Sequence, residues 1–184
     1  MKRSFDLFAS LFGVVLVGPI IAVFAFLVWL QDRHNPFYIA ERTGLNEEPF
    51  KMVKLRSMIK GADKSGVDST AGDDDRITGI GKTIRKLKLD ELPQLINVLL
   101  GEMRIFGPRP FPPQDTRHWE SNLIDIRHSV EPGLLGHWQV YSRGRITDRE
   151  QIMVDCEFIL SRNYMNDARI LLFALPSLIQ TRTK

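Results

Sequence analysis

The sequence has almost no cysteine and no long block of one charge sign. Cys156 is the only cysteine, so no internal disulfide can form, and no CxxC or Cys/His spacing typical of a zinc site occurs. No aromatic-basic ribbon or nucleic-acid reader motif is present. These absences argue against a disulfide scaffold, a zinc centre and a nucleic-acid-binding module. The net charge is only +3, with an isoelectric point near 9.1, and such weak basicity suits an anionic partner such as a phosphate or a lipid headgroup.

Charge is also missing from one long stretch near the N-terminus, the apolar run from Leu7 to Leu30. This run is too long for the apolar part of a signal peptide, and no small-residue cleavage site follows it. As a helix it would reach roughly 36 Å, against about 30 Å for the hydrocarbon core of a bilayer. The sequence therefore predicts a membrane-embedded N-terminal segment.

Gly18 and Pro19 lie near the middle of this segment, where proline removes a helical hydrogen bond and predicts a sharp kink. Basic residues flank both ends, so neither end is marked for the far side of a membrane. We expect a re-entrant helical hairpin over 1–34, followed by a cytoplasmic catalytic domain at the membrane interface over 35–184. A kinked helix that crosses the membrane once is the alternative.

The rest of the chain predicts an α+β fold that is predominantly helical, with interfacial amphipathic helices and a small β element. The apolar spacing over 92–99 indicates a helix that starts next to Pro93 and ends at Gly101. Other expected segments are a linker over 31–50, a short strand over 49–58, a flexible loop over 61–81, a helical pattern from Lys82, a turn and strand over 132–144, and a capped helix over 147–164.

Two adjacent carboxylates, Asp90 and Glu91, come directly before the helix that starts near Pro93. The positive end of the helix dipole favours the ionised form of both side chains, and the free backbone N–H groups there bind phosphate oxygens. An ionised aspartate is a candidate nucleophile or ligand of a hard cation. The simpler interpretation is that both residues only cap the helix.

Basic residues bracket the two carboxylates, among them Arg76, Arg85, Lys88 and Arg109. Carboxylates inside a ring of cations would repel a free anion, so the arrangement makes sense if a divalent cation bridges carboxylate and phosphate. Mg²⁺ is the natural candidate, with Asp90 as its ligand. The basic side chains would then hold the remaining phosphate oxygens.

Several segments together resemble a known family. They are KLRSM (54–58), DRITGIGKTIRKLKLDELPQLINVLLGEMRIFGPRP (75–110), PGLLGHWQV (132–140) and Asp155 within MVDCEF. The chain is similar over nearly its whole length to the bacterial sugar transferases that are monotopic phosphoglycosyl transferases, the enzymes that initiate lipid-linked glycan assembly. In length it resembles the small subgroup with a single catalytic unit.

The resemblance implies a ping-pong reaction. The aspartate that matches Asp90 attacks the sugar-linked phosphorus of a UDP-sugar, expels UMP and carries the phosphosugar until a polyprenyl phosphate, such as undecaprenyl phosphate, takes it. Glu91 matches an acid/base or orienting group, Mg²⁺ sits at the aspartate, and Arg109 binds phosphate. The remaining substrate-binding candidates are Arg76, Arg85, Lys88, Gln139 and Arg143.

The resemblance also implies a location and partners. It places the protein in the bacterial inner membrane with its catalytic domain facing the cytoplasm, and its re-entrant helix breaks at a proline that matches Pro19. An N-acetylated UDP-sugar is the expected donor, membrane lipid is the other expected contact, and a homodimer is left open. Two alternatives stay open for the function, a non-catalytic membrane-anchored adaptor that binds anionic lipid and a direct one-step phosphoryl transfer.

Overall fold

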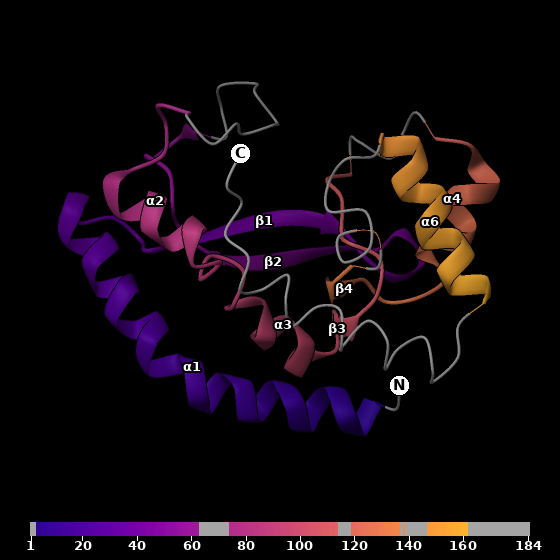
Figure 1. Ribbon diagram of the computed structural model, residues 1–184, viewed down its shortest axis with the longest axis horizontal. Helices are drawn as coiled ribbons and strands as arrows, with labels where there is room; N and C mark the ends of the chain where they lie inside the picture. The colour runs from indigo at the N-terminus through magenta and orange to yellow at the C-terminus, as the bar shows by residue number, and fades with distance from the viewer. Residues whose placement is uncertain (1–2, 63–73, 114–118, 137, 139–146, 162–184) are drawn as a thin grey trace.

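The computed structural model describes residues 3–62, 74–113, 119–136, 138 and 147–161, drawn in colour in Figure 1. Strands β1 (Phe37–Thr43) and β2 (Pro49–Leu55) form an antiparallel pair, and β3 (Arg104–Phe106) and β4 (Gly133–Leu135) form a parallel pair. The helices are α1 (Arg3–Asp32), α2 (Gly79–Lys86), α3 (Gln94–Leu100), α4 (Ser121–His128) and α6 (Asp148–Leu160). The fold mixes helix and strand and is mostly helical, as the sequence predicts.

Helix α1 is long and apolar enough to cross a membrane, and 11% of its most apolar stretch is buried. It is continuous from Arg3 to Asp32 and contains Pro19, and it bends near its middle rather than folding back as two separate helices (Figure 1). Its concave side packs on α3, where a methyl group on Gly13 would come within 3.0 Å of Leu95. The outward side exposes large apolar side chains, including Phe8 at 73% and Val15 at 71%.

Both ends of α1 are tied to the globular part of the protein. Near its start, Asp6 is buried and accepts hydrogen bonds from the Arg104 side chain at 3.1 Å and from the Ile105 backbone at 3.2 Å. At its end, Asp32 forms a two-pronged ion pair with Arg56, with N–O distances of 2.6 and 2.8 Å. The bent helix is thus held at two points on one body.

The sheet pair β1–β2 corrects the expectation of a linker over 31–50. Residues 37–43 form strand β1, in register from Phe37 opposite Leu55 to Thr43 opposite Pro49. Aromatic and β-branched residues in this segment favour a strand once a partner is available, and the partner is β2, which occupies 49–55 of the strand predicted over 49–58. Charged and proline residues on either side hide this pattern in the sequence.

Asn97 attaches helix α3 to the edge of strand β2. Its side chain accepts a hydrogen bond from the Val53 backbone at 3.1 Å and donates to the Lys51 carbonyl at 2.8 Å and to Glu102 at 2.7 Å. The residue is buried, so the bonds replace those that water would make. Helix α3 ends at Gly101, whose φ of 94° is the left-handed cap expected from the sequence.

Helix α2 begins at Gly79, three residues before the predicted start at Lys82. The Thr78 side chain accepts a hydrogen bond from the Gly81 backbone at 2.9 Å, which caps the helix there. A Cβ on Gly81 would lie 1.9 Å from the Ser57 carbonyl oxygen, so only glycine permits this approach. This close contact packs α2 against the segment that follows β2.

Helices α4 and α6 pair at the opposite end of the molecule from α2 (Figure 1). Thr147 caps α6 with a full capping box involving Glu150, at the start of the capped helix predicted over 147–164, where the sequence also allowed Asp148 as the cap. In the predicted turn and strand over 132–144, β4 occupies 133–135. Most of the remainder lies outside the described residues, as does most of the predicted loop over 61–81.

Candidate functional site

The two carboxylates lie in a tight turn between helices α2 and α3. Lys88 adopts a φ of 54°, the left-handed conformation that reverses the chain after α2. Two backbone hydrogen bonds fix this turn. The Leu89 N–H donates to the Ile84 carbonyl at 2.9 Å, and the Leu55 N–H donates to the Asp90 carbonyl at 3.0 Å. Asp90 is thereby placed beside strand β2.

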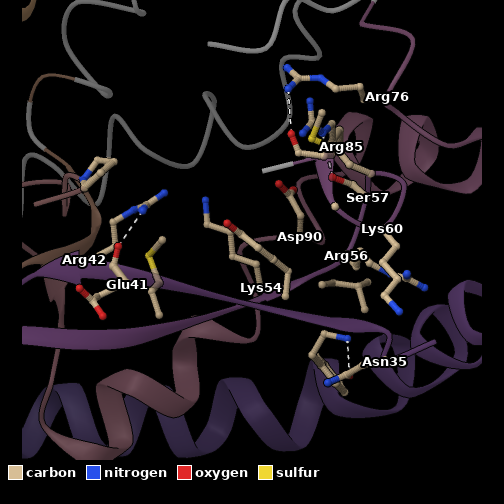
Figure 2. Close-up of a pocket in the computed structure, with 18 of the residues that line it drawn as sticks. Asn35, Glu41, Arg42, Lys54, Arg56, Ser57, Lys60, Arg76, Arg85 and Asp90 are labelled. Atoms are coloured by element: carbon tan, nitrogen blue, oxygen red, sulfur yellow. Dashed lines mark hydrogen bonds between the residues drawn. The ribbon is translucent and has the colours of Figure 1, made fainter. Parts of the chain in front are cut away.

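Asp90 lines a cavity of about 880 Å³ bounded by β1, β2, the segment after β2 and the turn formed by GPRP at 107–110, which contains Arg109 and is called the GPRP turn or the Arg109 turn. Figure 2 shows Asp90 with Lys54 and Arg85 in its central part, Glu41 and Arg42 on one side, and Arg56 and Lys60 on the other. The lining is strongly basic. Its cationic side chains are Arg42, Lys54, Arg56, Lys60, Arg76, Arg85 and Arg109, against the carboxylates Glu41 and Asp90.

Arg109 pairs with Glu91 at 2.5 Å. The turn that carries Arg109 is held by close backbone packing, because the Gly133 backbone donates to the Pro108 carbonyl at 2.8 Å. A Cβ on Gly107 would lie 2.7 Å from the Glu131 carbonyl oxygen, so no side chain fits there. The β3–β4 pairing therefore positions the Arg109 side chain against Glu91.

A buried ion pair between helices α4 and α6 also holds the Arg109 turn. Arg127 of α4 donates to the backbone carbonyl of Arg109 and pairs with Asp155 of α6 at 3.1 Å. Its guanidinium also lies 4.5 Å from the Phe111 ring centre and 5.4 Å from that of Trp119. Arg127 and Asp155 are almost fully buried, so α4 and α6 fix the Arg109 turn through charge and stacking.

The two carboxylates differ in their electrostatic environment. Burial, followed by the neighbouring Glu91 charge, raises the pKa of Asp90. Burial also acts against ionisation of Glu91, but attraction to Arg109, their hydrogen bond, and the positive charges of Lys54 and Lys88 lower its pKa overall. At Asp90, burial acts against the stabilisation of the ionised form that the sequence predicts at the start of this seven-residue helix, and the pKa is raised overall.

Lys54 of β2 is a half-buried cation of the site. Burial, and then repulsion from Arg109, lower the pKa of Lys54 to about 8, while Glu91 and Asp90 act in the opposite direction. The side chain therefore remains charged at neutral pH and loses its charge in mildly alkaline solution. In the charged form it faces the same cavity as Asp90.

Residues 1–181 match the bacterial sugar transferase family. The chain is 35% identical over 98% of its length to the undecaprenyl-phosphate glucose phosphotransferase of Komagataeibacter xylinus, of which it covers 36%. It is 42% identical over 72% of its length to a putative undecaprenyl-phosphate N-acetylgalactosaminyl 1-phosphate transferase of Bacillus subtilis, of which it covers 74%. It is 32% identical over 98% of its length to the UDP-glucose:undecaprenyl-phosphate glucose-1-phosphate transferase of Caulobacter vibrioides, covering 70% of it.

The chain belongs to the bacterial sugar transferase family. The match extends over helix α1 as well as the cavity. The chain spans about a third of the Komagataeibacter relative and about seven tenths of the other two.

In this sugar transferase the structure brings together most of the predicted site residues that it describes. Asp90, Arg76, Arg85 and Arg109 line the cavity, and Glu91 contacts Arg109 at its edge. Lys88 is exposed and does not contribute to the cavity lining among the described residues. Gln139 and Arg143 lie outside the described residues.

Sequence reasoning missed Lys54 and Ser57 as site residues. Ser57 accepts a hydrogen bond from the Arg85 side chain at 2.9 Å, which aims that arginine into the cavity. Both residues belong to the KLRSM segment that carries part of the family resemblance, and this membership is the signal that could have found them. No pattern in the sequence indicated Arg127 as a site residue, because its role depends on contacts with α6 and with the Arg109 turn.

The lowered pKa of Lys54 predicts an alkaline limit on activity. Below pH 8 the ammonium is charged and supports binding of an anionic donor, whereas above pH 8 the charge is lost. We expect kcat/KM for the donor to fall with an apparent pKa near 8. In Lys54→Arg, whose guanidinium stays charged, the fall should move up by at least about one pH unit. An unchanged profile in that variant would assign the limit to another group.

The Arg127 contacts predict a selective effect on the Arg109 turn. Arg127→Lys keeps a cation opposite Asp155 but loses the planar fork that also reaches the Arg109 carbonyl, so KM for the donor should rise by about tenfold. Arg149→Lys alters an exposed pair with Glu120 and should leave KM unchanged. Steady-state kinetics and thermal unfolding together test this. A tenfold loss confined to kcat, or a parallel loss of folded protein, would contradict it.

Proposed function

We propose that the protein transfers a phosphosugar from a UDP-sugar to a polyprenyl phosphate, releases UMP and forms a covalent aspartyl intermediate at Asp90. The observation that carries this proposal is the position of Asp90, a carboxylate in a cavity to which the described residues contribute seven cationic side chains. Relatives of this chain are named as undecaprenyl-phosphate sugar-phosphate transferases, which supports the substrate classes. A carboxylate beside cations such as Arg85 and Arg109 suits attack on a phosphorus atom whose negative oxygens these arginines hold.

The two carboxylates take different roles in this proposal. Asp90 accepts no hydrogen bond from another side chain among the described residues, so its oxygens are open to substrate. Glu91 is engaged by Arg109 at 2.5 Å and its pKa is lowered, so it stays ionised and orients the arginine. Arg109, Arg85 and Arg76 line the cavity and bind the donor phosphates.

Mg²⁺ fits the carboxylate that is left open. Proteins bind this ion with one or two carboxylates together with water and substrate phosphates, and Asp90 supplies one such oxygen ligand inside the cavity. The described part of the chain holds no group of three or more His, Cys, Asp or Glu that could bind a metal without substrate. When bound, the ion would neutralise charge on the donor phosphates.

The membrane arrangement follows from the way both ends of α1 are held. Asp6 and Asp32 are paired with Arg104 and Arg56 of the same globular body, so a helix that crossed the bilayer would have to break one pair. We propose that α1 enters and leaves the cytoplasmic leaflet of the inner membrane on one side, bending at Gly18 and Pro19. Its exposed apolar side would face the acyl chains.

The nucleophile is tested with the donor alone. Wild-type protein mixed with a UDP-sugar and Mg²⁺, without acceptor, should release about one UMP per active site and gain the mass of a phosphosugar on the peptide containing Asp90. Asp90→Asn should lose the burst and the adduct by at least about 1,000-fold, whereas the exposed Asp125→Asn should keep both. A burst retained by Asp90→Asn would remove this residue from the role of nucleophile.

The wild-type result also separates the competing functions. A direct one-step transfer predicts UMP release only when acceptor is present, and a lipid-binding adaptor predicts no turnover at all. Comparing UDP-glucose with UDP-N-acetylgalactosamine in the same assay tests the expected N-acetyl group, because relatives are named for both sugars.

The topology is tested by labelling cysteines placed on either side of α1. In a Cys156→Ser background, Lys2→Cys and Asn35→Cys should both react with a membrane-impermeant maleimide in inverted inner-membrane vesicles and stay unreacted in intact spheroplasts. The reason is that both helix ends are bound to one body. Labelling of the two positions from opposite sides would establish a single crossing and rule out the re-entrant arrangement.

A further inference from the structure

The cavity extends from the proposed nucleophile to the end of the membrane helix. Its lining includes Asp90 and also the residues that directly follow α1, namely His34, Asn35, Phe37 and Tyr38. Figure 2 shows Asn35, Arg56 and Lys60 on one side of Asp90, away from Glu41 and Arg42. One end of the cavity therefore lies where the chain leaves α1.

That end lies at the level where a bilayer surface is expected. The uncharged run of α1 stops at Leu30. The Trp29 ring stacks on the Phe26 ring with their centres 5.9 Å apart, and the Arg33 guanidinium lies 4.2 Å from the centre of the Trp29 ring. Tryptophan and arginine side chains concentrate at the boundary between acyl chains and water. A molecule held in the membrane can reach this end of the cavity without leaving the headgroup layer.

The side chains at this end combine apolar surface with a positive charge. Ile59, next to Lys60 in the chain, is 53% exposed, and Tyr38, opposite Lys54 near the start of β1, is 38% exposed; both line the cavity. Arg56 is neutralised by Asp32, whereas Lys60 is exposed and has no carboxylate partner among the described residues. Exposed apolar side chains beside a cation match an amphiphilic phosphate better than a sugar nucleotide.

The chemistry of substitution at phosphorus decides how two substrates share the cavity. In the second step an acceptor oxygen forms a bond to the sugar-linked phosphorus while the bond from that phosphorus to the Asp90 oxygen breaks, which regenerates the carboxylate. In-line attack requires the acceptor oxygen to approach from the side on which UMP left. The UMP phosphate and the acceptor phosphate thus occupy the same position, one after the other. The nucleoside of the donor and the isoprenoid chain of the acceptor then extend from that position in different directions.

We propose that the end of the cavity bounded by Tyr38, Ile59 and Lys60 is the entrance for the lipid acceptor, an isoprenoid monophosphate held in the membrane. The isoprenoid chain passes Tyr38 and Ile59 toward the bilayer, and Lys60 guides the phosphate toward the phosphosugar on Asp90. The nucleoside of the donor extends toward the opposite end, near Arg42 and the Arg109 turn. This inference rests on the proposed function, and it assigns separate ends of one cavity to the two substrates.

The test measures the two half-reactions separately with the full-length protein in lipid nanodiscs. The first is UMP release from donor alone. The second starts from the isolated adduct, freed of nucleotide, and follows product formation with undecaprenyl phosphate or with geranyl phosphate, a short soluble isoprenoid phosphate. Lys60→Glu should leave the first within about twofold and lower the second-step kcat/KM by at least about tenfold for both acceptors, as expected for loss of a charge-assisted contact.

Ile59→Ser distinguishes the path of the chain from that of the phosphate. It should lower the second step with undecaprenyl phosphate by several-fold and leave both the reaction with geranyl phosphate and UMP release unchanged. Lys82→Glu, an exposed lysine of α2 outside the cavity lining, is the matched charge control and should change neither half-reaction.

Two outcomes would overturn the inference. If Lys60→Glu lowers both half-reactions equally, this end of the cavity binds the donor. If neither Lys60→Glu nor Ile59→Ser alters the second step, the acceptor enters elsewhere. Failure of the wild-type protein to form any adduct would instead refute the proposed function.

Discussion

The attachment of both ends of α1 to one globular body is the constraint on which the rest of the structure depends. Asp6 is buried against Arg104 and the backbone of Ile105, and Asp32 is bound to Arg56 by two hydrogen bonds. Arg104 begins β3, which leads into the GPRP turn, and Arg56 follows β2, which carries Lys54. The residues that anchor the apolar helix are therefore neighbours in sequence of the residues that line the cavity, so the same short segments position both α1 and the site.

Local ion pairs neutralise three of the cationic side chains that line the cavity in the described part of the chain, Arg56, Arg76 and Arg109. Glu91 is committed to Arg109, Asp74 to Arg76 and Asp32 to Arg56. Asp90 stays outside these pairs, and its burial raises its pKa. A carboxylate that is poorly solvated and weakly paired is a better nucleophile than one held in a salt bridge, since less stabilisation is lost when its charge is transferred to a new bond.

Local signals in the sequence predicted the features that local chemistry determines. Pro93 and Gly101 bracket helix α3, and Thr147 caps α6, because each acts on backbone groups within a few residues. Strand β1 was missed because its stability depends on pairing with β2, and the earlier start of α2 depends on the contact between Gly81 and Ser57. Composition and family resemblance identified the two carboxylates together with Arg76, Arg85 and Arg109. Lys54 acts on Asp90, which lies 36 residues away in sequence, and Arg127 acts on Arg109, which lies 18 residues away, so neither could be found from local patterns.

Strand β2 connects the two ends of the cavity that we assign to the two proposed substrates. Its outer end pairs with the start of β1, directly after α1, and its backbone at Leu55 bonds the Asp90 carbonyl. Asn97 fixes the middle of the strand to α3, and Leu55 at its end therefore holds both the start of β1 and the Asp90 backbone in place. In the proposed mechanism the acceptor entrance, where the chain leaves α1, and the phosphosugar on Asp90 are therefore held at the same end of β2.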